Sequence, residues 1–122
     1  MAASSAHELT KKKCKPCAQG ALPFSLAQAK EAVRQIPGWI LANDGKSISR
    51  EFAMKNFLAA VHLIGLIAEV AEGEDHHPDL HLTGYRKLRI ELATHSIGGL
   101  SENDFILAAK IDELPKELKK SA

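Results

Sequence analysis

The apolar positions in the first third of the chain recur with the period of an amphipathic helix. Ser25 and Gln28 form a capping-box pair, which marks the start of a helix. The apolar positions that share one face of this helix are Leu26, Ala29, Val33 and Ile36. Pro37 and Gly38 interrupt the pattern, because proline cannot continue the backbone hydrogen bonds of a helix. The sequence therefore predicts a helix over residues 25–36.

Shorter stretches of alternating character predict strands. Residues 39–41 and 47–53 flank Asn43-Asp44-Gly45, whose residue types tolerate the positive φ of a hairpin turn. Further along, Leu88, Ile90 and Leu92 alternate with more polar residues, as in a strand with one buried face and one wet face. A short additional strand is predicted around residues 80–82. Gly98-Gly99 follows the last strand and breaks it.

Two further helices complete the pattern. One stripe of apolar residues runs through residues 55–72: Phe57, Ala60, Val61, Ile64, Ala68 and Ala71. A second capping box, Ser101-Glu102-Asn103-Asp104, opens a helix that continues to Ile111 and ends before Pro115. The resulting order is helix, strand, strand, helix, strand, helix. It predicts a single α+β domain in which a small antiparallel sheet carries about three helices on one face.

The length and composition of the chain restrict the class of protein and its domain organisation. A chain of 122 residues with 45% hydrophobic and 25% charged residues is typical of one globular domain. Residues 1–20 are polar, lysine-rich and aperiodic, and we expect them to form a loosely ordered leader before a domain over residues 21–122. The formal net charge of +1 gives no bias toward nucleic acid. The lysine clusters of residues 11–15 and 116–120 lack aromatic neighbours and are interpreted as solvated tails.

The expected location is the cytoplasm, with exchange into the nucleus for so small a protein. No stretch approaches the roughly 20 apolar residues that cross a bilayer, and the first residues contain no apolar segment of a secretion signal. The two cysteines, Cys14 and Cys17, fit a reducing compartment. We interpret this Cys-x-x-Cys pair as two ordinary thiols, with half of a zinc site or a redox pair as the alternatives.

Histidine is the most suggestive residue type in the chain, because its unperturbed pKa of about 6.5 suits proton transfer near neutrality. His76 and His77 follow the helix that ends near residue 72, and His95 lies at the exit of the strand that begins at Leu88. His7, His62 and His81 have weaker claims. The alternative is that a histidine at a helix end is favoured by the helix dipole alone.

The histidine pair does not resemble a metal site. Pro78 biases His77 to an extended conformation, in which neighbouring side chains point to opposite sides. The chain also lacks the His-Glu-x-x-His arrangement of a helical zinc site. We therefore predict no bound metal at this cluster.

Carboxylates surround the histidines in sequence: Glu72, Glu74, Asp75 and Asp104. A carboxylate next to an imidazole can fix its tautomer and favour its charged form. The alternative for Asp104 is a purely structural role in its capping box, and for the other three a solvated helix end. The residues alone thus predict a histidine–carboxylate cluster for general acid–base chemistry, and they name no substrate.

The spacing of these residues resembles a known family. Glu72-x-x-x-His76-His77-Pro78 is followed by Tyr85 after six residues, His95 after nine more and Asp104 after a further eight. These anchors, together with Pro37-Gly38-Trp39 and Thr94-His95, resemble the pterin-4a-carbinolamine dehydratases, and the resemblance covers about residues 24–113. The interval from His77 to His95 is one residue longer than in the animal enzymes and resembles the plant and protist branch. We expect a bulge at Gly84-Tyr85 to absorb it.

The resemblance implies an enzyme that removes water from 4a-hydroxytetrahydrobiopterin to give quinonoid dihydropterin, in the recycling of tetrahydrobiopterin, without a metal or an organic cofactor. It implies catalytic roles for His76, His77 and His95, of which His76 and His95 would be the acid–base pair and His77 would orient the substrate or share the proton transfers. The substrate-binding residues that it implies are Glu72, Asp75, Pro78, Thr94, Ser96 and Asp104.

The family also implies partners. We expect the chain to form a homodimer or homotetramer, and a small sheet with an open edge favours such pairing. Animal members act as dimerisation cofactors of a homeodomain transcription factor, so a binding module without catalysis is the alternative function. Neither direct binding of nucleic acid nor insertion into a membrane is expected.

Overall fold

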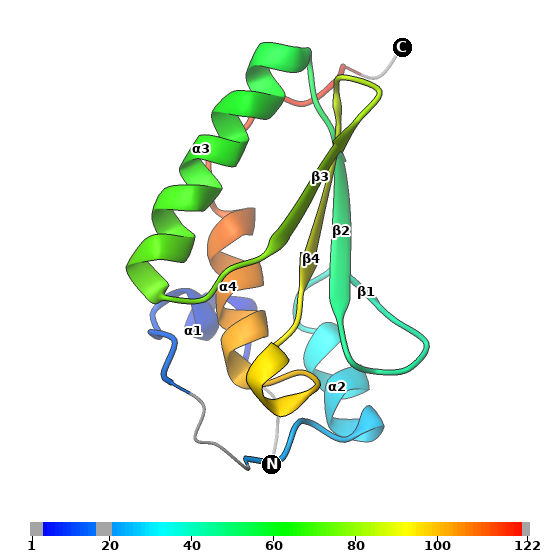
Figure 1. The fold of residues 1–122 in the computed structure, drawn as a ribbon, viewed down its shortest axis with the longest axis vertical. Helices are drawn as coiled ribbons and strands as arrows, with labels where there is room; N and C mark the ends of the chain where they lie inside the picture. The colour runs from blue at the N-terminus through cyan, green and yellow to red at the C-terminus, as the bar shows by residue number, and fades with distance from the viewer. Residues whose placement is uncertain (1–3, 17–20, 121–122) are drawn as a thin grey trace.

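The computed structural model describes residues 4–16 and 21–120 (Figure 1). The helices are α1 (Ala6–Thr10), α2 (Leu26–Val33), α3 (Phe57–Glu74) and α4 (Glu102–Asp112), with a 3₁₀ turn η1 (His95–Ile97). The strands are β1 (Ile40–Leu41), β2 (Ile48–Ala53), β3 (Asp79–Thr83) and β4 (Lys87–Leu92). The predicted α+β class is confirmed, and the short strand expected around residues 80–82 is present as β3.

The four strands form one antiparallel sheet in the order β1-β2-β4-β3. Its register places Ile48 opposite Leu92 and Phe52 opposite Leu88, so apolar side chains gather on one face. Glu51 and Arg89, which lie opposite each other on β2 and β4, point to the other face and are exposed. The sheet therefore has one dry face, and β3 and β1 are its two edges.

The hairpin between β3 and β4 corrects one expectation. Gly84 and Tyr85 have φ values of 53° and 56° and lie in the loop of this hairpin. The pairing of β3 with β4 continues without interruption from Asp79–Glu91 to Thr83–Lys87. The predicted bulge is therefore absent from this hairpin, because the positive-φ residues lengthen the connection instead of distorting a strand.

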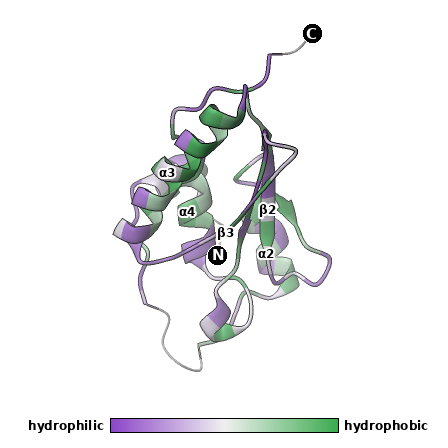
Figure 2. Cartoon of the chain, turned by 45° about the horizontal axis from the view of Figure 1, so that its top comes forward, coloured by the Kyte–Doolittle hydropathy of each residue, from purple (hydrophilic) through white to green (hydrophobic). Residues whose placement is uncertain are grey.

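The core lies between the sheet and helices α3 and α4, which lie on the same side of the sheet (Figure 1). Much of α3 and α4 is hydrophobic in Figure 2, whereas the loops are mostly hydrophilic. The largest fully buried side chains come from these elements and their connections: Phe105, Ile36, Ile48, Met54, Leu63, Ile67, Leu88, Ile90, Leu92, Leu100, Ile106 and Leu107. None of the helices in residues 4–16 and 21–120 is long and apolar enough to span a membrane.

Helix α1 was not predicted from the hydrophobic pattern. Its N-cap is Ser5, whose hydroxyl accepts a hydrogen bond from the Glu8 amide, while the Glu8 carboxylate accepts one from the Ser5 amide. The helix packs against α4, and Leu9 is 3% exposed. A five-residue helix with one buried side chain has no measurable period, so only its capping box marks it in the sequence.

Candidate active site

The centre of the site is the pair His76–Asp104, which joins the loop after the C-terminal end of α3 to the first turn of α4. Asp75 ends α3 in the left-handed conformation, with φ 52°, and the amide of His76 donates to the carbonyl of Ala71. The chain leaves the helix at this point, and the His76 Nε2 atom lies 2.7 Å from Oδ1 of Asp104. The side chains are 11% and 0% exposed, so water does not screen the contact.

The second oxygen of Asp104 is also engaged. Oδ2 accepts a hydrogen bond of 2.8 Å from the Thr94 hydroxyl and one of 3.0 Å from the amide of Ser101. The Thr94 and Ser101 hydroxyls lie 2.8 Å apart. The position of Asp104 in the first turn of α4 further favours a negative charge. Asp104 therefore serves both as a helix cap and as the carboxylate partner of His76.

His95 is connected to the same carboxylate through its neighbour. Thr94 precedes His95, which opens the η1 turn, and the amide of Thr94 donates to the carbonyl of Gly99 across 2.8 Å. Gly98 closes this turn with φ 69°. His95 is exposed, and the adjacent hydrogen bond from Thr94 to Asp104 fixes the backbone from which it projects.

His77 has a different partner. Its Nε2 atom lies 2.5 Å from Oε2 of Glu72, and the two side chains are 57% and 76% exposed. An exposed pair of this kind contributes little to stability. The two neighbouring imidazoles thus contact different carboxylates, as expected from an extended chain, and His77 lies outside the buried network.

The other predicted residues do not join the network through a hydrogen bond of their side chains. Asp75 and Ser96 are exposed, and Pro78 is half-buried at the entry to β3. Sequence reasoning missed the contribution of Ser101, whose hydroxyl and amide complete the surroundings of Thr94 and Asp104. The signal for it was present, since Ser101 was recognised as the first residue of the capping box.

Within the described residues, no group of three or more His, Cys, Asp or Glu side chains is arranged to hold a metal ion. Cys14 is half-buried, and burial, followed by the charge of Glu74, raises the pKa of its thiol to about 12. A thiol of this pKa is a poor redox nucleophile near neutral pH. Cys17, the other member of the pair, lies outside the described residues.

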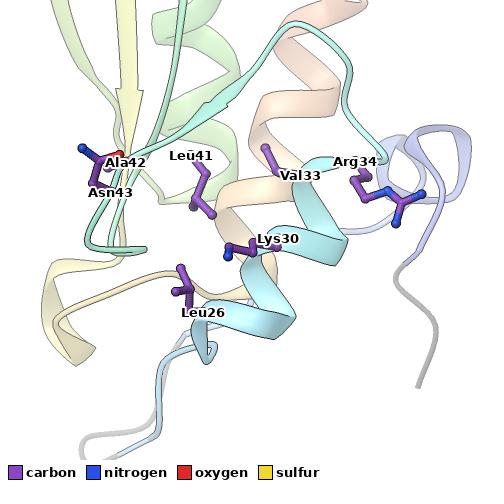
Figure 3. Close-up of a pocket in the computed structure, with 7 residues that line it drawn as sticks. All are labelled: Leu26, Lys30, Val33, Arg34, Leu41, Ala42 and Asn43. Atoms are coloured by element: carbon purple, nitrogen blue, oxygen red, sulfur yellow. The ribbon is translucent and has the colours of Figure 1, made fainter.

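A cavity of about 500 Å³ lies elsewhere, between α2 and β1 (Figure 3). Its lining residues are Leu26, Lys30, Val33, Arg34, Leu41, Ala42 and Asn43. None of them belongs to the histidine–carboxylate cluster, so this cavity is separate from the candidate active site.

Fold and site together define a small α+β protein with an imidazole–carboxylate pair suited to acid–base chemistry. The model of the family described as pterin 4 alpha carbinolamine dehydratase matches residues 22–114. The chain belongs to this family.

Individual relatives agree with this membership. A protein of Halorhodospira halophila that bears the family name is 47% identical over 106 residues, covering 87% of this chain and 96% of the relative. Pterin-4-alpha-carbinolamine dehydratase 2, mitochondrial, of Arabidopsis thaliana is 44% identical over 113 residues, covering 90% of this chain and 60% of that protein. A crystal structure from Brucella melitensis, named a transcriptional coactivator/pterin dehydratase, is similar with a TM-score of 0.69 and 32% identity, over 74% of this chain and 95% of that one.

Proposed function

We propose that this protein removes water from 4a-hydroxytetrahydrobiopterin to give quinonoid dihydropterin, in the recycling of tetrahydrobiopterin. The observation that carries the proposal is the buried contact between His76 and Asp104 in a chain of the dehydratase family. Hydroxide is a poor leaving group, so an acid has to protonate the hydroxyl oxygen as the carbon–oxygen bond breaks. A base takes the proton from the neighbouring ring nitrogen, and the electrons of that N–H bond form the new carbon–nitrogen double bond.

In this proposal, the surroundings of His76 favour one of its two nitrogens for this work. Both oxygens of Asp104 accept hydrogen bonds, and Oδ1 faces Nε2 of His76, so the neutral imidazole carries its proton on Nε2. Nδ1 is then the atom that accepts a proton from the substrate or, in the charged imidazole, delivers one. In this proposal His95 performs the complementary transfer from the η1 turn, and each transfer contributes roughly 10²- to 10⁴-fold in rate.

The remaining residues bind and orient the pterin in this proposal. His77, held by Glu72, lies on the exposed side of the same loop and orients the substrate. Asp75, Pro78, Thr94 and Ser96 border the two catalytic loops, and we assign them to the pterin contact surface. The chemistry needs no electron transfer, so the proposal includes neither a metal nor an organic cofactor.

Single substitutions test the acid–base assignment. We expect His76→Ala and His95→Ala each to lower kcat by about 10²- to 10⁴-fold in a dehydration assay. His62→Ala is the matched control, because His62 is an exposed histidine on α3 far from both loops in sequence. Rates close to wild type in both His76→Ala and His95→Ala would contradict the proposal.

The binding-module function is the second candidate, favoured by the name of the similar Brucella melitensis structure, a transcriptional coactivator/pterin dehydratase. Here the protein would act as a dimerisation cofactor for a transcription factor. Turnover of pterin carbinolamine by the purified chain supports the enzyme. Stable co-purification with a DNA-binding protein, together with no turnover, supports the cofactor role.

We also propose that the chain forms a homodimer or homotetramer. β3 is an open edge of the sheet, and α3 exposes three apolar side chains, Phe57, Leu58 and Val61, at 55%, 76% and 44%. Light scattering on the purified protein distinguishes these assemblies from the monomer mass of 13.2 kDa. A monomeric mass at micromolar concentration would contradict the proposal.

For location we propose the cytoplasm, with access to the nucleus. A fluorescent fusion at the C-terminal end would show diffuse signal in both compartments. Import into mitochondria, the location in the name of the Arabidopsis thaliana relative, is the contrary outcome.

A further inference from the structure

We propose that the segment Cys14–Lys15 acts as a clamp that positions the His76–Asp104 pair. The segment lies before the region that matches the family model, which begins at residue 22. It contacts the end of α3 and the start of α4, the two places from which His76 and Asp104 project. The effects that we expect on turnover rest on the proposed function, whereas the positioning of the His76–Asp104 pair does not.

The first half of the clamp is on Glu74, the last residue of α3. The amide of Cys14 donates to Oε1 of Glu74 across 2.8 Å, and Lys110 of α4 donates to Oε2 across 3.2 Å. The Glu74 and Lys110 side chains are 9% and 20% exposed. Glu74 stands two residues before His76, so these contacts fix the end of the helix from which the catalytic loop departs.

The second half is on Asn103, the neighbour of Asp104 in α4. Its Oδ1 accepts from the amide of Lys15 across 3.0 Å, and its Nδ2 donates to the carbonyl of Lys15 across 2.6 Å. The Cys14 sulfur lies 3.6 Å from the carbonyl of Asn103. Asn103 is 8% exposed, so this two-point contact is shielded from water.

The geometry explains why such a clamp matters for the pair. His76 and Asp104 are 28 residues apart and meet only because the ends of α3 and α4 lie side by side. Cys14 and Lys15 bind both ends through adjacent backbone groups, and Lys110 joins α4 to Glu74 directly. A displacement of about 1 Å between catalytic groups costs up to about 10² in rate, so restraint at this point favours catalysis. Glu74 and Asn103 are therefore positioning residues.

The test compares variants on each half of the clamp. We expect Asn103→Ala and Glu74→Ala to lower kcat by at least about fivefold while KM changes less than about twofold. Glu74→Gln keeps an oxygen that accepts from the Cys14 amide, so it should recover most of the lost kcat. Lys12→Ala is the control in the same leader, because the ion pair of Lys12 with Glu102 is exposed, and this variant should leave kcat unchanged.

A second readout does not depend on turnover. Nitrogen-15 NMR of the imidazoles reports the tautomer of His76, and we expect the Nε2–H signature to weaken in Asn103→Ala and Glu74→Ala and to persist in Lys12→Ala. Thermal unfolding establishes that each variant is folded at the assay temperature, and if one alanine variant is not, the other decides. Folded alanine variants with wild-type kcat and an unchanged His76 tautomer would overturn the clamp. Absence of turnover in the wild type would overturn the proposed function and leave the tautomer test valid.

Discussion

At the scale of single residues, Asp104 holds the candidate site together through its two oxygens. Oδ2 accepts from Thr94 and from the amide of Ser101, and Oδ1 faces His76. The amide of Ser101 can only donate a hydrogen bond, so the atom at the Oδ2 position has to be an acceptor. The identity of the group at Oδ1 therefore decides the tautomer of His76.

Asp104→Asn tests this dependence with almost no change in shape. The amide oxygen of the variant should occupy the Oδ2 position, so its NH₂ group would face His76 and force the proton onto Nδ1. We expect kcat to fall by about 10²- to 10⁴-fold, measured by steady-state kinetics alongside imidazole NMR. Asp79→Asn, an exposed carboxylate on β3, should behave as wild type. An unchanged kcat in Asp104→Asn would contradict the role of this carboxylate.

Cys14 offers a second prediction at this scale. Burial and the charge of Glu74 raise the pKa of its thiol from 9.0 to about 12, so the thiolate fraction at pH 8 should fall by roughly three orders of magnitude. We expect iodoacetamide to modify Cys14 at least about 100-fold more slowly in the folded protein than in urea. The measurement uses a Cys17→Ser variant, so that one thiol remains. Equal rates in the two states would contradict the burial of this thiol.

At the scale of elements, the turn that presents His95 depends on one backbone conformation. Gly98 has φ 69°, and nothing lies within 4 Å of a side-chain atom added there. A substitution therefore meets no steric contact and changes only the backbone energy. Gly65 in the middle of α3 is also free of neighbours within 4 Å, but it has an ordinary helical conformation.

Alanine substitutions at these two glycines should therefore change the stability of the fold in opposite directions. Gly98→Ala should destabilise the fold by about 1 kcal/mol, because alanine resists the left-handed region. Gly65→Ala should stabilise it by about 0.5–1 kcal/mol, because alanine reduces the entropy lost when the helix forms. Urea unfolding of both variants measures the difference. A neutral or stabilising Gly98→Ala would show that the turn can adopt another conformation.

The elements also show what the sequence can predict and what it cannot. The helices that begin at residues 26, 57 and 102 were predicted because their apolar faces repeat over several turns, and their caps at Ser25 and Ser101 follow local rules. Helix α1 is too short to repeat. The bulge expected at Gly84-Tyr85 was wrong, because two positive-φ residues can lengthen a hairpin loop as readily as they distort a strand.

The site was predictable as a set of residue types and not as a set of contacts. Glu72, Glu74, Asp75 and Asp104 were all candidate partners of the histidines. The left-handed turn at Asp75 directs His76 to a carboxylate 28 residues away, while His77 contacts Glu72 on the helix just completed. Such a choice depends on how α3 and α4 pack, which no local pattern encodes. The contacts of Cys14 and Lys15 are non-local for the same reason.

At the scale of the whole molecule, the segment before the family domain is part of the folded structure where it is described. Leu9 adds a buried side chain against α4, and Cys14 and Lys15 add backbone hydrogen bonds to the ends of α3 and α4. Glu74 is the point where these contacts meet an ion pair with Lys110. The charge on Glu74 therefore strengthens the contacts that join the leader to α3 and α4, and the stability of the fold depends on it.

Burial would raise the pKa of Glu74, but the hydrogen bonds from Cys14 and Lys110 and the charges of Lys110 and Lys13 outweigh it and lower the pKa below 4.5. The carboxylate thus stabilises the folded state above pH 4.5, and this contribution is lost as the pH falls through the lower folded-state value. We expect Glu74→Gln to reduce the free energy of unfolding by about 1–2 kcal/mol at pH 7 and by progressively less below pH 4.5.

Urea unfolding of wild type and variant at pH 7, 5 and 3 measures whether their free energies of unfolding converge as the pH falls. Glu69→Gln is the matched control, because Glu69 is an exposed carboxylate in the same helix, and its effect should stay within about 0.5 kcal/mol. If Glu74→Gln were equally destabilising at every pH, the loss would come from packing and not from the charge. If it had no effect at pH 7, the charge of Glu74 and its ion pair with Lys110 would contribute nothing to the stability of the fold.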